Sequence, residues 1–591
     1  MSCPPLPNDR IPEPKNKRHF VADISLPNTP VMHQNNCEEV DYQAEGQPPG
    51  IASFTKGLKH NNRGEVANSV DFISFRNAIQ NCLNEFPNYG MSLSFIETVP
   101  VGTGIADPTK RRRWVNPVCG LSYDSEGLDS FNRKMEPAPR IDSSDPPNAG
   151  AEMAELYWMA LLRDLNFTDY DEEDLAQEAV DDLRNNFGSY KFITGWIRDV
   201  GEDIVPFSVK TLFRGTNVGD DVGPYISQFM LRGNKDEPIG REEDDGYVKY
   251  GTTSIDQRHV VAKKGLDFMT DNESWVKVQD GLLTFTDRDR LEDDNNRYFD
   301  DKRRFIRNLR DLATYVHFDV LYQAYITACL YMISAGFMVS DDNPYSKMDI
   351  EKQEGFGNFG EPHIVSLIPE VSTRALKAEW LQKWFVHRRL RPEAFGGLIH
   401  HHKENPRYPF IDRSTILASP VLEKIFESNK EANKKLKSGN RDKDKGTYFL
   451  PQAFPEGSPM HPSYGAGHAV VAGACVTVLK AWFKDGPMPG KIVEAKHNGR
   501  RLKKYKGDDK DKITIHGELN KLAANIAIGR NAAGVHYRSD YTASLHLGEE
   551  VAISVLKELK SYLPEPQKDP VQPIFRFKRF FTDPADPPES I

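Results

Sequence analysis

Cysteine is scarce in this sequence, with six residues spread over 591 positions: Cys3, Cys37, Cys82, Cys119, Cys329 and Cys475. They form neither the closely spaced pairs of a zinc site nor the dense pattern of a small disulfide scaffold. We therefore expect buried or free thiols. The first 20 residues lack the apolar run of a secretory signal, and on this ground we expect a cytoplasmic protein.

Positive charge is also in deficit, since the formal net charge at pH 7 is -10. Nucleic acids and anionic membranes generally bind basic surfaces, so we expect neither as a partner. The most apolar stretch, residues 315–339, is interrupted by His317, Asp319, Gln323 and Thr327. A lipid-exposed span rarely tolerates such residues, so this stretch is interpreted as a buried core helix.

Alternating strand patterns are absent, whereas helical periodicity is frequent after residue 150. Apolar residues recur at helical spacing in residues 151–165, 172–186, 302–334, 372–390, 467–483, 518–528 and 541–562. A hydrophobic fraction of 38% supplies material for a core. We predict an all-α fold, in which helical bundles are joined by long loops.

The chain divides into two predicted parts. Residues 1–150 contain scattered Pro, Gly and Asn with few long periodic runs, which predicts an irregular arm that wraps the core or contacts another subunit. Residues 151–591 are predicted to form the helical domain. Within it, two stretches rich in Lys, Asp and Asn, residues 428–445 and 497–512, are interpreted as solvated loops between core helices.

Three consecutive histidines, His400, His401 and His402, invite interpretation as metal ligands. Consecutive side chains diverge in regular structure, so these three cannot easily share one metal ion. We therefore interpret them as loop residues.

Three other segments supply polar groups suited to a tetrahedral oxyanion. In the first, Lys383 and Arg391 lie eight residues apart, close enough to two helical turns for a shared face. The second, His461-Pro-Ser-Tyr-Gly-Ala-Gly467-His468, leads into an apolar helix. The positive end of that helix would expose backbone N–H groups, including that of Gly467, to an anion.

The third segment extends from Arg530 to Asp540. Arg530 precedes His536 by six residues, and Asp540 follows that histidine by four. If this part is helical, Asp540 can orient the His536 ring. Taken singly, each of the three segments is better explained as a solvated helix face or an ordinary helix start.

Together and in this order, the segments resemble the split signature shared by vanadium haloperoxidases and the type 2 phosphatidic acid phosphatase superfamily: Lys...Arg-Pro, then Pro-Ser-Gly-His, then Ser-Arg...His...Asp. Their wide separation and the chain length are similar to those of algal and cyanobacterial bromoperoxidases. Two residues depart from the signature, because Ala466 and Gly529 stand where it has serine. The first change removes a hydroxyl donor and so concerns cofactor affinity.

The resemblance implies a buried vanadate cofactor between helical bundles. His536 would be the protein ligand to vanadium, and Lys383, Arg391 and Arg530 would neutralise the vanadate oxygens together with the amide of Gly467. Arginine suits this task because its planar guanidinium presents several donors to an oxyanion.

Further roles follow from the same resemblance. His468 would act as general acid and base beside the cofactor, a task for a group that titrates near neutrality. His461 would tune proton supply and halide choice, and Trp380 would lie near the halide. Asp319 would pair with Arg530, because a buried carboxylate needs a cation.

The implied activity is oxidation of bromide, and of iodide, by hydrogen peroxide to hypohalous acid, which halogenates an organic acceptor. Relatives assemble, so we expect a homo-oligomer, a dimer or higher. One alternative is an acid phosphatase that uses the same residues, with His536 forming a phosphohistidine and His468 protonating the leaving group. Another is a non-catalytic oxyanion-binding protein, which His468 and His461 disfavour because anion capture needs no second proton-transfer histidine.

Overall fold

The computed structural model describes residues 16, 31–85, 112–144, 148–187, 207–234, 246–282, 298–347, 353–565, 571–582 and 586–591. In these ranges the chain is mainly helical, which confirms the all-α prediction. The strands in the described ranges form three two-stranded antiparallel sheets: β1 (Tyr247–Tyr250) with β2 (Thr253–Asp256), β3 (Val493–Ala495) with β4 (Leu502–Lys504), and β5 (Arg576–Phe577) with β6 (Glu589–Ser590).

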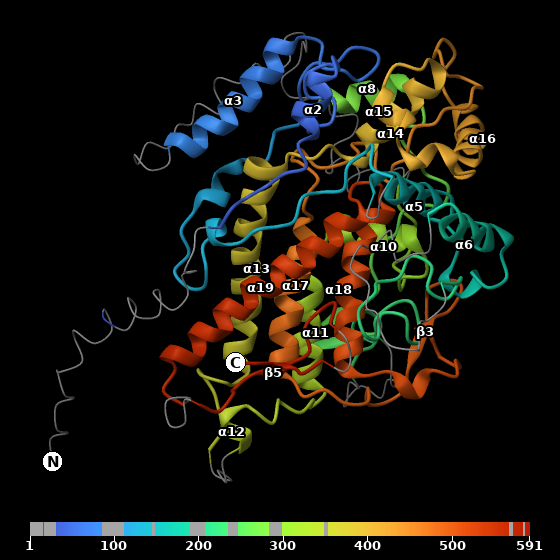
Figure 1. Ribbon diagram of the computed structural model, residues 1–591. Helices are drawn as coiled ribbons and strands as arrows, with labels where there is room; N and C mark the ends of the chain where they lie inside the picture. The colour runs from blue at the N-terminus through green and yellow to red at the C-terminus, as the bar shows by residue number, and fades with distance from the viewer. Residues whose placement is uncertain are drawn as a thin grey trace, which may run out of the picture.

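A bundle of long helices occupies the middle of the molecule (Figure 1). It consists of α11 (Gln323–Ser334), α13 (Glu361–Leu381), α17 (Gly467–Trp482), α18 (Ile515–Ala532) and α19 (Arg538–Tyr562). Helix α17 contacts all four of the others, and nearly all of its residues are buried. Its apolar sequence fits this central position, because a helix that is hydrophobic all round belongs in a core.

Helices α17 and α19 approach each other very closely at two glycines. A Cβ atom at Gly473 would collide with the carbonyl oxygen of Leu545, and one at Gly548 would collide with that of Val470. The absence of side chains at these two positions therefore permits backbone-to-backbone contact between the two helices.

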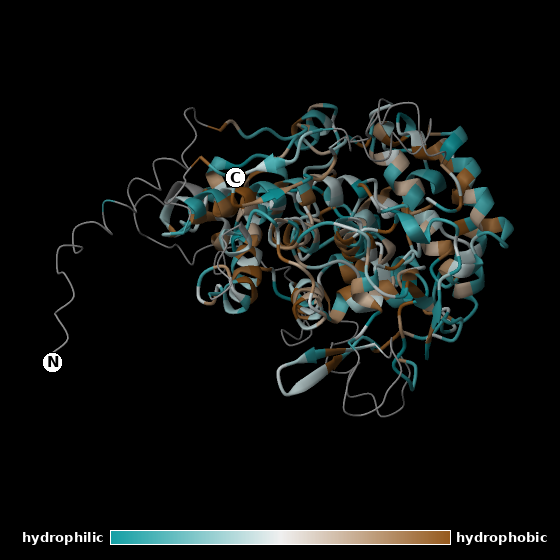
Figure 2. Cartoon of the chain, turned by 90° about the horizontal axis from the view of Figure 1, so that it is seen from below, coloured by the Kyte–Doolittle hydropathy of each residue, from teal (hydrophilic) through white to brown (hydrophobic). Residues whose placement is uncertain are grey.

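The other α-helices of the described residues lie around the bundle. They are α2 (Glu38–Ala44), α3 (Ser69–Glu85), α5 (Ala149–Leu161), α6 (Asp174–Asn185), α8 (Asn272–Gln279), α10 (Leu309–Phe318), α12 (Pro344–Lys347), α14 (Pro392–Glu404), α15 (Pro409–Asp412) and α16 (Val421–Asn433). Figure 2 shows hydrophilic and hydrophobic segments intermixed on the outer helices. In α6, for example, Ala176, Ala179, Val180 and Leu183 are buried at the spacing of a single helix face.

The predicted single helix over residues 302–334 is wrong. Two helices, α10 and α11, occupy this stretch, and α10 is capped by Asp319, whose ψ of 153° lies outside the helical region. Asp319 therefore marks a helix end instead of interrupting a helix. Among the described residues, no helix is both long enough and apolar enough to cross a membrane.

The interpretation of His400, His401 and His402 as loop residues is also wrong, because all three are buried within α14. The two stretches interpreted as loops contain regular structure as well. Helix α16 extends to Asn433, and β4 and a short 3-10 helix (Lys510–Lys512) lie within residues 497–512. Composition predicted the polar character of these segments but missed their backbone conformation.

The described part of residues 1–150 packs on the helical domain. Phe54, Leu58, Phe72 and Phe75 form a second apolar cluster with Leu381, Trp384 and other residues. The interpretation of these residues as an irregular arm does not anticipate the 17-residue helix α3. Five cysteines, Cys37, Cys82, Cys119, Cys329 and Cys475, are free thiols as predicted, and Cys3 lies outside the described residues.

Candidate active site

The first predicted segment is not a continuous helix. After α13 the chain forms a π-helical turn, η8 (Gln382–His387), and Arg388 then adopts a left-handed conformation with φ 44° and ψ 34°. Lys383 lies inside the π turn, whereas Arg391 is the N-cap of α14. The prediction that Lys383 and Arg391 share a helix face is therefore wrong. They come together because the chain turns at Arg388.

Lys383 is fully buried and holds the second segment by its backbone. Its Nζ donates to the carbonyl oxygens of Pro462 at 3.1 Å, of Ser463 at 3.2 Å and of Gly465. Burial lowers the pKa of Lys383 to about 7. The ammonium group is thus held by neutral carbonyl groups, and an anion beside it would favour its charged form.

Arg391 connects the second segment to the third. Its Nη2 lies 3.0 Å from Nδ1 of His461, and its Nη1 donates to the Val535 carbonyl oxygen at 2.7 Å and lies 3.1 Å from Nε2 of His536. Burial lowers the pKa of Arg391 to about 9. One guanidinium therefore touches both of the histidines that flank it.

The orientation of His536 follows from its second ring nitrogen. Nδ1 of His536 lies 2.8 Å from Oδ2 of Asp540, as predicted, and the same oxygen accepts a bond from the Tyr537 N–H at 3.1 Å. Since a carboxylate accepts, Nδ1 carries the proton and Nε2 presents its lone pair, towards which the Arg391 guanidinium points. Helix α19 begins only at Arg538, so Asp540 reaches back from its first turn.

Gly467 is the first residue of α17, as predicted, and Ala466 is its N-cap without a side-chain cap. The N–H of Ala466 donates to Oγ of Ser544 at 2.8 Å. Gly465 lies so close to Ser544 and Glu379 that a Cβ there would collide with both side chains. The other serine replacement, Gly529, lies against α10, where a Cβ would come within 3.0 Å of Val316.

Asp319 has a different partner from the one expected. It accepts a hydrogen bond from His468, with 2.9 Å between Nε2 and Oδ1, whereas Arg530 donates to the Val316 carbonyl oxygen at 3.0 Å. No ion pair joins Asp319 to Arg530 among the described residues, although the carboxylate raises the pKa of Arg530 against the larger lowering effect of burial. Asp319 thus orients the His468 ring through Nε2, and Nδ1 is the second ring nitrogen.

Trp380 and His461 lie beside each other, with ring centroids 5.0 Å apart. The Lys383 ammonium lies 5.7 Å from the centre of the Trp380 ring. Burial, with Lys383 and Arg391 next in effect, lowers the pKa of His461 far below its ordinary value. His461 is therefore neutral and accepts from Arg391, while Trp380 forms an aromatic wall next to it.

The site contains an excess of buried positive charge. Lys383, Arg391 and Arg530 are each at most 6% exposed, and none forms an ion pair with a carboxylate among the described residues, although the charge of the buried Glu379 raises the pKa of Lys383 against the larger effect of burial. Nε of Arg530 is buried without a hydrogen-bond partner. Burial, followed by Arg391 and Lys383, lowers the pKa of His536 far below its ordinary value. Buried cations are normally paired, so this arrangement suits an anion.

Arg389 is a residue of the site that the sequence analysis missed. Its Nη1 donates to Oδ1 of Asp540 at 2.9 Å, its Nη2 donates to Oε2 of Glu152 at 2.9 Å, and it lies 3.8 Å over the Tyr537 ring. Arg389 thereby holds the carboxylate that orients His536. The sequence could have indicated this role, because Arg389 lies two residues before Arg391 and side chains two apart in extended chain point to the same side.

We predict that Arg389→Lys lowers the free energy of unfolding by about 1–3 kcal/mol, because lysine cannot bridge two carboxylates and cover Tyr537 at the same time. Chemical denaturation followed by circular dichroism measures this. Arg441→Lys, at an exposed arginine, is the matched control and should change stability by less than about 0.5 kcal/mol. Equal stability of Arg389→Lys and the parent protein would show that Arg389 does not support Asp540.

Glu379 was missed as well. It is fully buried one turn before Lys383, accepts a bond from Ser544 Oγ at 3.3 Å, and has one oxygen without a partner among the described residues. Burial raises the pKa of Glu379 to about 7. The helical periodicity of residues 372–390 did not show that this glutamate is buried and not solvent-exposed.

Comparisons with known proteins agree with this geometry. Residues 425–565, which include the second and third segments, match a family model described as the VCPO second helical-bundle domain. Over 575 residues the chain is 40% identical to a vanadium-dependent bromoperoxidase of Corallina pilulifera, covering 92% of this chain and 93% of that protein. A vanadium-dependent bromoperoxidase of Ascophyllum nodosum is 32% identical over 568 residues, with coverages of 95% and 91%.

One solved structure is similar over nearly the whole chain. It is the homohexameric structure of the second vanadate-dependent bromoperoxidase (AnII) from Ascophyllum nodosum, with a TM-score of 0.80 and 27% sequence identity. The match covers 98% of this chain and 93% of that chain. The similarity therefore includes the described part of residues 1–150 as well as the helical domain.

Proposed function

The chain belongs to the vanadium-dependent bromoperoxidase family, and from this premise we propose that hydrogen peroxide oxidises bromide at the site around His536. The product is hypobromous acid, which halogenates an organic acceptor. Iodide is oxidised by the same route.

The buried cations with no carboxylate partner support this proposal most strongly. Vanadate is a tetrahedral oxyanion, and Lys383, Arg391 and Arg530 would neutralise its oxygens together with the backbone N–H of Gly467. Nε2 of His536 would be the coordinating atom, because Asp540 holds the proton on Nδ1. When bound, vanadate supplies a Lewis-acidic centre that activates hydrogen peroxide towards attack by halide.

The remaining steps belong to the side chains. His468, oriented by Asp319, would accept a proton from hydrogen peroxide and return a proton to the oxygen that leaves as water. Lys383 and Arg391 stabilise the negative charge on the oxygens during the reaction. The neutral His461 and Trp380 border the halide and influence which halide is accepted.

The proposal is tested by an assay of two activities on one preparation. Orthovanadate-loaded protein should brominate a phenolic dye in the presence of hydrogen peroxide and bromide, with no bromination when either substrate is omitted. Release of phosphate from a small phosphate ester, measured on vanadate-free protein, should be negligible. Phosphate release without bromination would instead favour the phosphatase alternative, and neither activity would favour simple oxyanion binding.

The pKa of Lys383 predicts a pH dependence of vanadate binding. Since burial lowers this pKa to about 7, free protein loses the Lys383 proton as the pH rises above 7, and vanadate binding must then take up a proton. The affinity should fall by up to roughly tenfold per pH unit from this residue. Measurement is by half-saturation of bromination with orthovanadate between pH 6 and 9.

Lys383→Met is the matched variant for this prediction, because the ionisation of vanadate itself is common to both proteins. Its affinity should be weaker at low pH and should depend less on pH. Parallel pH profiles for the parent and Lys383→Met would contradict the role of Lys383.

We also infer that the chain forms a homo-oligomer, as its homohexameric structural neighbour does. The described N-terminal residues expose large apolar side chains, namely Met32, Val40, Val70 and Tyr123, which are 60–75% exposed. We expect light scattering at micromolar concentration to give a multiple of the 67.0 kDa chain mass. A mass of one chain would refute this inference.

A further inference from the structure

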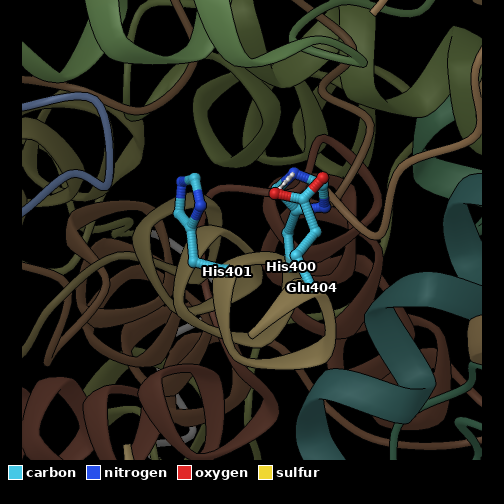
Figure 3. A group of neighbouring side chains, drawn as sticks. All are labelled: His400, His401 and Glu404. Carbon is cyan, nitrogen blue, oxygen red and sulfur yellow. Dashed lines mark ion pairs between the residues drawn. The ribbon is translucent and has the colours of Figure 1, made fainter. Parts of the chain in front are cut away.

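Two histidines and a glutamate near the end of α14 form a cluster outside the site described above. They are His400, His401 and Glu404. Each offers one ligand atom, and these three atoms lie within 4.8 Å of one another. Figure 3 shows the three side chains extending in the same general direction from the helix, with His400 and Glu404 overlapping in this view.

Helix geometry explains why these three side chains meet. Consecutive histidines diverge by about 100° around a helix, which was the reason to doubt a shared metal ion. Glu404, however, follows His400 by four residues and His401 by three, so it lies between them around the helix axis. Its Oε2 lies 3.6 Å from Nε2 of His400. The carboxylate therefore lies close to His400 and within 4.8 Å of the ligand atom of His401.

Both imidazoles are buried against aromatic rings. His400 is 1% exposed and His401 is 5% exposed. The Phe449 ring centroid lies 4.1 Å from that of His400 and 5.9 Å from that of His401, and Trp275 lies 5.6 Å from His401. Burial lowers the pKa of His400 to about 3 and that of His401 to about 4. Both rings are therefore neutral, which is the form that binds metal ions.

The Nε2 atoms of both histidines form no hydrogen bond among the described residues. Each of these atoms is buried, and the Glu404 carboxylate approaches that of His400 only to 3.6 Å. Buried polar atoms normally form hydrogen bonds, so two buried nitrogens without one, next to the half-exposed Glu404 carboxylate, require an explanation. A cation bonded to all three groups supplies one.

We propose that His400, His401 and Glu404 bind a divalent transition metal ion such as Zn²⁺, with water in the remaining coordination positions. Two imidazole nitrogens and one carboxylate oxygen suit Zn²⁺, whereas Ca²⁺ and Mg²⁺ prefer ligand sets of oxygen alone. Arg391, at the opposite end of α14, belongs to the active site. The ion would thus fix the last turn of this helix without contacting the reacting groups.

Two existing contacts compete with the metal ion. Arg441 Nη2 lies 3.4 Å from Oε2 of Glu404 and places a positive charge beside it. The Tyr448 N–H donates to Nδ1 of His400 over a long 3.3 Å, and metal binding at Nε2 moves the ring proton to Nδ1 and breaks this bond. We therefore expect an affinity in the micromolar range, weaker than that of a dedicated structural zinc site.

The test is a titration of the full-length, orthovanadate-loaded protein, freed of divalent ions on a chelating resin, with Zn²⁺ in competition with a chromophoric chelator. We expect one equivalent of Zn²⁺ per chain. Glu404→Gln and His401→Ala should each weaken binding by at least about tenfold. Arg441→Gln should strengthen binding, because it removes the competing charge.

Controls distinguish this site from general surface binding. Glu431→Gln and His497→Ala remove an exposed carboxylate and an exposed imidazole away from the cluster, and should leave the affinity unchanged. Glu404 is half-exposed, so Glu404→Gln should preserve the fold even if His401→Ala does not, and circular dichroism checks both. Unchanged binding in Glu404→Gln, or no binding by the parent protein, would overturn the proposal.

Discussion

Replacing His536 with alanine is expected to abolish vanadium retention and to lower bromination by on the order of 10³-fold or more. Loss of one preorganised oxyanion donor alone costs about 10²–10³ in rate in comparable sites, and His536 would supply the only coordinate bond from the protein. The cations that remain, Lys383, Arg391 and Arg530, should still attract an oxyanion, but one that exchanges freely. Elemental analysis after gel filtration measures retention directly.

The matched control is His497→Ala, which removes an exposed histidine from a surface segment. It should retain as much vanadium as the parent protein. His536→Ala should also keep its far-ultraviolet circular dichroism spectrum, because a single small cavity beside Asp540 leaves the bundle contacts intact. Equal vanadium content in His536→Ala and the parent protein would show that another group binds the metal.

Replacing His468 with alanine should separate proton transfer from cofactor binding. We expect kcat to fall by about 10²–10⁴-fold, the range for loss of a positioned general acid and base, while most of the vanadium is retained. Asp319→Asn should have a smaller effect in the same direction, because Asp319 orients Nε2 of His468 and does not itself touch the reactants. Steady-state bromination with hydrogen peroxide and vanadium analysis give the two quantities.

Measuring vanadium content also shows whether a loss of activity in His468→Ala is due to loss of the cofactor. If His468→Ala and His536→Ala lose vanadium to the same extent, His468 acts in binding and its assignment to proton transfer is wrong. A normal kcat in His468→Ala would have the same consequence. Thermal unfolding of both variants checks that neither substitution disrupts the start of α17 or α19.

The sequence predicted the helical fold, because helical periodicity can be recognised without knowledge of tertiary contacts. The three motif segments also meet in the structure, since Lys383 contacts Ser463 and Arg391 contacts both His461 and His536. Helix ends were less predictable. The π turn after Leu381 and the cap at Asp319 both interrupt stretches whose apolar periodicity continues across them. Local periodicity does not record a change in backbone hydrogen bonding, so two helices were predicted as one.

The partners of the site residues were the harder part. Asp319 was expected beside Arg530 but orients His468, and Arg389 was not separated from the neighbouring basic residues. Such pairings depend on the relative positions of the ends of different helices. Those positions cannot be predicted from the sequence of one segment. For His400 and His401, the argument that consecutive side chains diverge is correct, but it did not consider Glu404, which lies one helical turn later.

The glycine contacts between α17 and α19 limit how far apart two histidines of the site can lie. His468 is the second residue of α17, and His536 lies two residues before α19 begins, so the separation of the two histidines depends on how these helices are spaced. That spacing is fixed at Gly473 and Gly548, where the backbones of the two helices are in contact. An added methyl group would collide with backbone atoms, so no change of side-chain rotamer could make room for it. Alanine at either glycine would push the two helices apart and so change the distance between His468 and His536.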